Sequence, residues 1–481
     1  MTTAKVSGKV AFLEAAHKLL GDRGFTRDPD RLEPWLTDWR GRYTGRALGL
    51  ASPGSTQEVA ALIRLCSAHA VPIVPQGGNS GMAGGATPDD SGDGVVLSLR
   101  RMNAIRSLDA GAGQAVCEAG VILQSLHEAA EAEDMRFPLT LGGKGSATIG
   151  GLISTNAGGT QVLRYGTMRA QVLGIEAVMA DGQVLDQLTA LKKDNRGFDL
   201  KQLLIGSEGT LGIVTAATVR LLPAPRSTVT AWIGLSAITD ARALLRQADR
   251  VLGDALEGFE VVPAHCLDSV LALLPEARSP LADRHSWNAL IECTSAGEEP
   301  AELQERLEAV LGAALHDGMI ADAVIATNEN QAQQFWTLRD SISAGERALG
   351  PAMQHDISVP VERMPEFILA AIPAIESEFP GTKGAAFGHL GDGNVHFHVL
   401  APAGAIAGKW EEADGKRVSA RVHDLVTEWG GSISAEHGIG QMKVDELGRL
   451  GDPAALSVMR SVKTALDPQN ILNPGKLVPA Q

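Results

Sequence analysis

The chain has 481 residues, of which 44% are hydrophobic, and its formal net charge is −15 at pH 7. This length predicts two or three domains, and the negative charge argues against nucleic acid as a partner and against a basic patch for anionic lipid. The four cysteines, Cys66, Cys117, Cys266 and Cys293, form no Cys-x-x-Cys pair, which argues against an iron–sulfur cluster or a structural zinc site built on thiolates.

The same sparse use of cysteine fits a reducing compartment. Residues 1–24 carry charged side chains through an amphipathic stretch instead of a continuous apolar segment, and no apolar run elsewhere reaches transmembrane length. We therefore expect a cytoplasmic protein without a transmembrane segment.

The first half of the chain predicts short strands and helices separated by glycine-rich turns. Ser55-Thr56-Gln57-Glu58 is a capping box that opens a helix to about residue 69. Pro223 and Pro225 end the pattern and mark the first domain boundary. Strands are predicted at 71–74, 94–99, 114–118 and 213–222, and a further helix at 121–133.

From residue 228 the sequence alternates between strand and helix patterns. Strands are predicted near 230–235, 259–262, 288–292 and 356–359, and helices near 237–252, 302–315, 331–349, 423–429 and 454–466. The predicted domains are residues 1–225, 226–425 and 426–481.

Three glycine-rich clusters, at 76–85, 142–159 and 206–212, interrupt the first half. A strand that ends in such a loop exposes consecutive backbone N–H groups, which can cradle a pyrophosphate. Gly111-Ala112-Gly113 lacks the later glycine of the dinucleotide fingerprint and precedes a strand, so NAD(P) binding by that fold has little support. The clusters indicate a long ligand lying across one domain, with ordinary turns in a glycine-rich chain as the alternative.

A histidine-rich hairpin is predicted at 385–399, where Asp392-Gly393 is a two-residue turn signal. This turn would pair His396 directly with His389. Opposed residues share a face, with Cβ atoms about 4.5–5.5 Å apart, so the two imidazoles can share one metal ion. His398 lies on the same face by alternation. The alternative is a surface hairpin with incidental histidines.

Several motifs together resemble a known family. Residues 75–81, 150–159, 164–166 and 206–212 resemble the FAD-binding domain of the vanillyl-alcohol-oxidase-type flavoproteins. With the hairpin, Ala435-Glu436-His437-Gly438 and the closing motif at 467–474, the chain resembles the FAD-linked D-2-hydroxyacid dehydrogenases. The resemblance runs from about residue 34 to the last residues and does not specify the substrate.

The resemblance implies an α+β protein with a two-subdomain FAD-binding domain, a substrate-binding cap domain with an antiparallel sheet, and a C-terminal helical segment that returns to the FAD domain. Covalent relatives attach the flavin to a histidine in the first loop, where this chain has Asn79 and Ser80, so non-covalent FAD is expected. The residues implied for the cofactor are Pro75, Gln76, Gly77, Gly78, Asn79, Ser80, Gly81, Gly145, Ser146, Gly150, Gly151, Thr155, Asn156, Gly158, Gly159, Tyr165, Gly166, Glu208, Gly209, Gly212, Ile213 and Asn473.

The resemblance also implies a reaction: oxidation of a D-2-hydroxy acid to the 2-oxo acid, with hydride transfer to flavin N5. A divalent cation, zinc or manganese, held by His389, His396 and Glu436 would polarise the substrate hydroxyl. His437 corresponds to the family's general base, a role that the natural pKa of imidazole suits near neutral pH.

The substrate residues implied are Arg339, Ser343, Gln354, Asn394 and His398. Arg339 and Ser343 are four apart and so predicted to share one helix face, and an arginine matches a carboxylate with two parallel hydrogen bonds. Asn394 is expected to support the turn or to touch the substrate. A lysine is typical of the D-2-hydroxyglutarate pattern where this chain has Gln354, and an asparagine where it has His398, so D-2-hydroxyglutarate is favoured over D-lactate, glycolate and D-malate only narrowly.

Electrons must leave the flavin for an external acceptor, such as an electron-transfer flavoprotein, a quinone or a cytochrome, because the sequence shows no second redox centre. A homodimer is compatible with the sequence, which does not determine the oligomeric state. The alternatives are a flavin subunit of a glycolate-oxidase-like complex, an FAD-dependent sugar or alditol oxidase, and a non-catalytic nucleotide-binding module.

Overall fold

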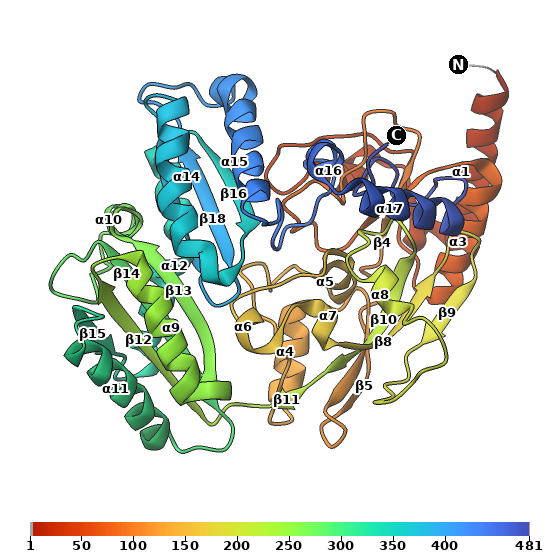
Figure 1. The fold of residues 1–481 in the computed structure, drawn as a ribbon. Coiled ribbons are helices and arrows are strands. Elements are labelled where there is room, and N and C mark those ends of the chain that lie inside the picture. The colour runs from red at the N-terminus through yellow and green to blue at the C-terminus, as the bar shows by residue number, and fades with distance from the viewer. Residues whose placement is uncertain (1–2, 481) are drawn as a thin grey trace. The chain divides into compact units, whose positions relative to one another are not determined.

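The computed structural model describes residues 3–480 (Figure 1). Contacts divide the chain into two compact units. The first comprises residues up to 159, 166–223 and those from 436 on; the second comprises residues 160–165 and 224–435. The first division falls at 223/224, two residues before the predicted boundary at 225. The second falls at 435/436, ten residues after the predicted 425.

The first unit contains two main sheets and a two-stranded one. The first sheet has the order β1-β2-β4-β3, with β2, β4 and β3 parallel, and the second has the antiparallel order β5-β6-β10-β8-β9. β7 pairs with β11. The strands are β1 (Phe25–Thr26), β2 (Leu50–Ala51), β3 (Ile73–Gln76), β4 (Val95–Ser98), β5 (Ile105–Asp109), β6 (Gln114–Glu118), β7 (Met135–Arg136), β8 (Val172–Val178), β9 (Val184–Gln187), β10 (Ile213–Arg220) and β11 (Leu222–Pro223).

Each main sheet of this unit carries its own apolar cluster, which agrees with an arrangement of two subdomains. The helices of the unit are α1 (Thr3–Gly24), α2 (Pro29–Leu32), α3 (Thr56–His69), α4 (Leu123–Glu131), α5 (Ile149–Thr155), α7 (Met168–Gln171), α8 (Lys201–Leu204), α16 (Val444–Leu450) and α17 (Pro453–Leu466).

Helix α3 shows how the sequence sets these elements. The Ser55 hydroxyl accepts a hydrogen bond from the Glu58 N–H at 3.2 Å and caps the helix, as the capping box predicts. Val59, Ile63 and Cys66 recur at helical spacing and are fully buried in the cluster of the first sheet. The helix ends at Ala70 in the left-handed conformation, with φ of 50°.

The C-terminal tail is part of the first unit. The Ile73 N–H donates to the carbonyl of Ile471 at 2.7 Å, and the Asn473 N–H donates to the carbonyl of Ile73 at 2.8 Å, so the tail lies alongside β3. The Lys463 ammonium donates to the carbonyls of Thr210 and Leu472 and fixes the tail further.

The second unit is built on a seven-stranded sheet of order β15-β12-β14-β13-β17-β18-β16, antiparallel in every described pair. One face is covered by α9, α11 and α14, which lie in front of the strands in Figure 1. Its strands are β12 (Ser227–Leu235), β13 (Leu256–Pro263), β14 (Trp287–Ser295), β15 (Asp322–Ile325), β16 (Ala352–Ser358), β17 (Lys383–His389) and β18 (Asn394–Leu400). Its helices are α6 (Val162–Tyr165), α9 (Ile238–Leu252), α10 (Ala264–Leu273), α11 (Pro300–His316), α12 (Glu329–Asp340), α13 (Ile342–Leu349), α14 (Met364–Glu378) and α15 (Lys416–Glu428).

The opposite face of this sheet packs against α10, α12 and α13. Trp232 and Leu290 on the sheet form one buried cluster with Phe335 and Leu338 of α12 and Ile342 of α13. None of the described helices is long and apolar enough to cross a membrane.

The single helix predicted at 331–349 is wrong. Helix α12 ends at Asp340, Ser341 has φ of −81° and ψ of −5°, and α13 begins at Ile342. A ψ near 0° lies outside the α-helical region, so the two segments are separate helices. Arg339 therefore lies on α12 and Ser343 on α13, on either side of this break.

Candidate functional site

The first unit contains a cleft lined by the glycine-rich loops. It encloses about 970 Å³ of empty space, part of it open to solvent. The loop after β3, the start of α5 and the turn before β10 form its walls. The predicted cofactor residues that line it are Pro75, Gln76, Gly77, Gly78, Asn79, Ser80, Gly81, Gly150, Gly151, Thr155, Glu208, Gly209, Gly212 and Ile213.

The close approach of the first two loops requires glycine. A Cβ atom at Gly78 would lie 1.7 Å from the Ser146 carbonyl oxygen, far inside any allowed contact. Gly78 thus lets two backbones that are distant in sequence form one wall. Backbone lining of this kind suits a long phosphate-bearing ligand, because it presents N–H groups without side chains in the way.

Eight residues predicted for the cofactor do not line the cleft. The Asn156 side chain accepts from the Thr167 hydroxyl and the Arg169 N–H, and so holds a turn. The Asn473 amide donates to the carbonyls of Gly85 and Glu208, which ties the tail to the cleft loops. The others are Gly145, Ser146, Gly158, Gly159, Gly166 and, in the second unit, Tyr165.

The sequence analysis missed several lining residues. Most are small or apolar and carry no chemical signal, but Thr148 caps α5 just before an apolar run, and this pattern is visible in the sequence. The missed residues are Ala83, Gly85, Ala86, Leu99, Ala119, Ala147, Thr148, Leu152, Ser154 and Val214.

His437 also lines the cleft, and Glu208 positions the segment that carries it. The buried Glu208 carboxylate accepts the Ile439 N–H at 2.7 Å and the Gly440 N–H at 2.8 Å. Burial raises the pKa of Glu208, while these two N–H groups act in the opposite direction. The Gln441 N–H adds a bond to the Ala83 carbonyl at 3.1 Å, so the segment is fixed beside the glycine loops.

In the second unit, the face of the sheet toward α12 and α13 carries the histidines of the hairpin. The predicted register is wrong by two residues: His389 pairs with Asn394, and His396 pairs with Phe387. The connection is longer than two residues because the Gly393 N–H donates to the His389 carbonyl and the Asp392 carboxylate accepts the Asn394 N–H. A shift of two preserves the face, and the rings of His389 and His396 lie 5.5 Å apart between centroids.

His389 has a defined tautomer. Its Nδ1 contacts the Glu260 carboxylate, and its Nε2 lies 3.1 Å from a guanidinium nitrogen of Arg339. Arginine has no acceptor, so Nε2 must accept and Nδ1 must carry the proton. Histidines that bind metal ions have this tautomer: one ring N–H donates to a carboxylate, and the other ring nitrogen is unprotonated.

His396 is also held in the neutral form. Burial lowers the pKa of His396 well below its ordinary value, and the positive charge of Arg339 adds to this effect. Asp356, which pairs with His396 in the β16–β18 register and is 1% exposed, acts in the opposite direction. A neutral imidazole is the form that binds a metal ion.

Arg339 forms an ion pair with Glu260, a residue that was not predicted from the sequence. The Arg339 Nε donates to Glu260 Oε2 at 2.9 Å, and Glu260 is 1% exposed. Burial raises the pKa of Glu260, but Arg339 and His389 outweigh it and lower that pKa to about 2. Two acids, Glu257 and Glu260, inside the otherwise apolar strand at 256–263 were the signal that could have found it.

Asn394 supports the turn region. Its amide donates to Asp356 Oδ1 at 2.9 Å and to the Ile357 carbonyl at 3.0 Å. The remaining predicted substrate residues lie on the same unit. Gln354 pairs with His398 in the β16–β18 register, and the His398 Nδ1 contacts the buried Glu346 carboxylate of α13. Ser343 lies on α13, one helix away from Arg339.

Comparisons with known proteins agree with this arrangement. A family described as an FAD binding domain matches residues 47–187, and one described as the C-terminal domain of FAD linked oxidases matches residues 224–477. A probable mitochondrial D-2-hydroxyglutarate dehydrogenase of Oryza sativa subsp. indica is 40% identical over 96% of this chain and 80% of the relative. A D-2-hydroxyglutarate dehydrogenase of Xanthomonas citri pv. viticola is 36% identical over 94% of this chain and 93% of the relative.

Among solved structures, p-cresol methylhydroxylase with bound substrate has a TM-score of 0.75 at 16% identity, covering 100% of this chain and 98% of that one. This likeness shows the vanillyl-alcohol-oxidase-type fold and an α+β architecture, as expected from the sequence.

Proposed function

Because the chain belongs to the family of FAD-linked oxidases and matches D-2-hydroxyglutarate dehydrogenases over most of its length, we propose that it oxidises a D-2-hydroxy acid to the 2-oxo acid, with D-2-hydroxyglutarate favoured. The observation that carries the proposal is the presence of His437, the predicted base, in the same cleft as the glycine loops. Residues 1–225 are proposed as the FAD-binding domain, 226–425 as the substrate-binding cap and 426–481 as the returning segment.

The cleft of the first unit fits non-covalent FAD. Its walls are backbone and small side chains, and Asn79 and Ser80 stand in the loop where a covalent attachment would need a histidine. When bound, FAD supplies the electron acceptor for the hydride of the substrate's α-carbon. His437, fixed through Glu208, removes the hydroxyl proton of the substrate.

The histidines of the second unit fit a divalent cation. The His389 Nε2 lone pair, which accepts from Arg339 in this structure, would bind the ion once the guanidinium turns to the substrate, His396 is neutral, and Glu260 and Asp356 are buried acids whose negative charge favours a cation beside them. In this proposal Glu436 is the third ligand, and the ion is zinc or manganese. Such an ion supplies a Lewis acid that makes the substrate hydroxyl easier to deprotonate.

Arg339 and Ser343 are proposed to bind the substrate carboxylate, and Gln354 and His398 to contact its far end, with Asn394 supporting the turn. Arg339 is held by Glu260, so its guanidinium is oriented before substrate arrives. We propose that the electrons pass to an external acceptor (an electron-transfer flavoprotein, a quinone or a cytochrome) and that the protein forms a homodimer. The cytoplasmic location stays a prediction.

A steady-state screen of D-2-hydroxy acids with an artificial dye as acceptor tests the substrate class. The proposal expects the highest kcat/KM for D-2-hydroxyglutarate, lower values for D-lactate, glycolate and D-malate, and little activity with the L-acids. Rapid peroxide formation with sugars or alditols, and no dye reduction with any of these acids, would overturn it.

A further inference from the structure

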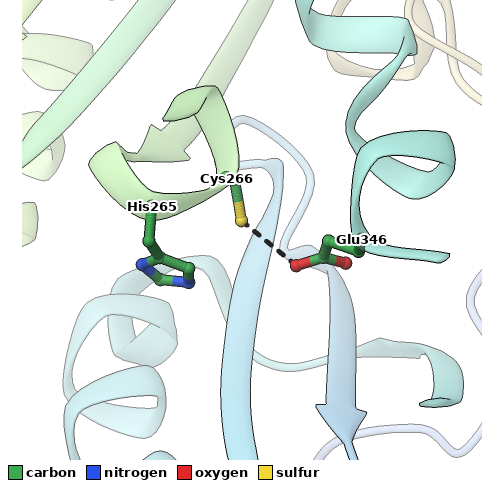
Figure 2. A group of neighbouring side chains, drawn as sticks. All are labelled: His265, Cys266 and Glu346. Carbon is green, nitrogen blue, oxygen red and sulfur yellow. Dashed lines mark hydrogen bonds between the residues drawn. The ribbon is translucent and has the colours of Figure 1, made fainter. Parts of the chain in front are cut away.

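A second group of metal-ligand side chains lies in the second unit, on α10 and α13. Figure 2 shows His265 and Cys266 at the start of α10 and Glu346 on α13, with the Cys266 sulfur directed at the Glu346 carboxylate. One donor atom from each residue can be chosen so that all three lie within 4.8 Å of one another. None of these residues is assigned a contact with the substrate or the flavin in the reaction proposed above; Glu346 takes part only through its contact with His398.

Close packing of the two helices places Glu346 opposite Cys266. A Cβ atom at Gly345 would lie 2.7 Å from the Ser269 hydroxyl, so the helices touch through backbone at this point. Cys266 is 0% exposed and Glu346 1% exposed. A carboxylate at this depth is stable only with partners, and the structure gives it two.

The contacts of Glu346 leave one oxygen suited to a metal ion. Its Oε2 contacts the His398 Nδ1, while its Oε1 lies 3.3 Å from the Cys266 Sγ. Zinc bonds of about 2.3 Å to sulfur and about 2.0 Å to oxygen at a tetrahedral angle give a sulfur–oxygen separation of roughly 3.5 Å. The sulfur and Oε1 therefore already stand at the spacing of two zinc ligands, and His398 provides the hydrogen bond that a ligating carboxylate usually receives.

His265 supplies the third donor and an entrance. Its side chain is exposed, and one of its ring nitrogens lies within 4.8 Å of the other two donor atoms, so rotation of the ring can bring that nitrogen to a tetrahedral ligand spacing. An exposed imidazole beside a buried thiol also gives an ion a path from solvent to the sulfur.

We propose that His265, Cys266 and Glu346 form a second divalent-cation site that takes zinc, with the fourth position open to water. Binding releases the Cys266 thiol proton and replaces the S–H···O contact with bonds from sulfur and Oε1 to the ion. The site differs in chemistry from the set His389, His396 and Glu436, which contains no sulfur. Widely spaced cysteines argued against a site built on several thiolates, whereas this one needs a single thiolate.

Cobalt(II) is the probe, because a cobalt–thiolate bond gives an intense near-ultraviolet charge-transfer band that nitrogen and oxygen ligands do not give. Titration of the metal-free full-length protein should produce this band with a stoichiometry of one, and excess zinc should abolish it. Cys266→Ser should remove the band, while Cys293→Ser, which alters another buried cysteine, should leave it unchanged.

His265→Ala changes an exposed side chain and so tests the site without disturbing the core. It should raise the cobalt Kd reported by the band by at least about tenfold. Absence of the band in the unaltered protein, or its persistence in Cys266→Ser, would overturn the proposal. Neither result bears on turnover of a hydroxy acid, so failure of this site and failure of the proposed reaction are separable.

Discussion

Replacing Glu260 with glutamine tests whether this buried acid organises the histidine face of the second unit. The substitution keeps the size of the side chain and removes its charge. Arg339, whose side chain is 11% exposed, then loses this buried acidic partner, while the more exposed Asp340 stays 3.6 Å away. The His389 Nδ1–H also loses its charged acceptor.

The expected loss of stability follows from two independent free-energy values. A fall in the pKa of Glu260 from 4.5 to about 2 corresponds to about 3 kcal/mol in favour of the charged form. Removal of one partner from a buried ion pair costs about 3–5 kcal/mol. For a unit of about 220 residues each kcal/mol lowers Tm by about 2–4 °C, so Glu260→Gln should lower the Tm of the second unit by roughly 6–20 °C.

Thermal and urea unfolding of the metal-free protein measure this effect. Glu376→Gln is the matched control: it lies in the same unit, and its carboxylate accepts the Gly384 N–H at 3.0 Å, a bond that a glutamine oxygen can replace. Glu376→Gln should lower the free energy of unfolding by about 1 kcal/mol or less. Equal stability losses in the two variants, or none in Glu260→Gln, would refute the assignment of Glu260 as the charge partner of Arg339.

Three further changes have expected outcomes. Gln354→Lys should raise the ratio of kcat/KM for D-2-hydroxyglutarate to kcat/KM for D-lactate by roughly 10- to 150-fold in a competition assay, because a hydrogen bond to a charged group contributes about 1.5–3 kcal/mol. An unchanged ratio would show that residue 354 does not determine substrate specificity. Glu346→Gln weakens the charged acceptor of His398 and should raise KM about tenfold with little change in kcat; unchanged kinetics would make His398 structural. Ser55→Ala should lower unfolding free energy by about 1 kcal/mol, measured in urea, and an effect near zero would contradict the cap.

The elements that the sequence predicted best are those set by local rules. The capping box at Ser55 and the spacing of Val59, Ile63 and Cys66 predict α3 almost to its ends. The glycine clusters predicted a phosphate-type cleft, and many of their residues line one. Local chemistry therefore indicated the first unit well.

The errors arose where hydrogen bonds that simple turn and spacing rules do not include decide the structure. Asp392-Gly393 reads as a two-residue turn, yet hydrogen bonds of the Asp392 carboxylate and the His389 carbonyl lengthen the connection. The break between the two helices at Ser341 could not be predicted, because no proline or glycine stands beside it in the sequence. The partners of Glu260 lie 79 and 129 residues away, so the apolar strand around it could mark it as unusual but could not identify Arg339 and His389 as its partners.

In the proposed reaction a bound cation and FAD act together on a D-2-hydroxy acid. Anaerobic mixing of the FAD-loaded protein with D-2-hydroxyglutarate, followed by flavin absorbance before and after complete chelation, tests it most directly. We expect rapid bleaching of the flavin in a single turnover, a rate at least about 100-fold lower after the metal is removed, and recovery of the rate with zinc or manganese. Bleaching at an unchanged rate in protein that metal analysis shows to be empty, or no bleaching with any D-2-hydroxy acid, would contradict it.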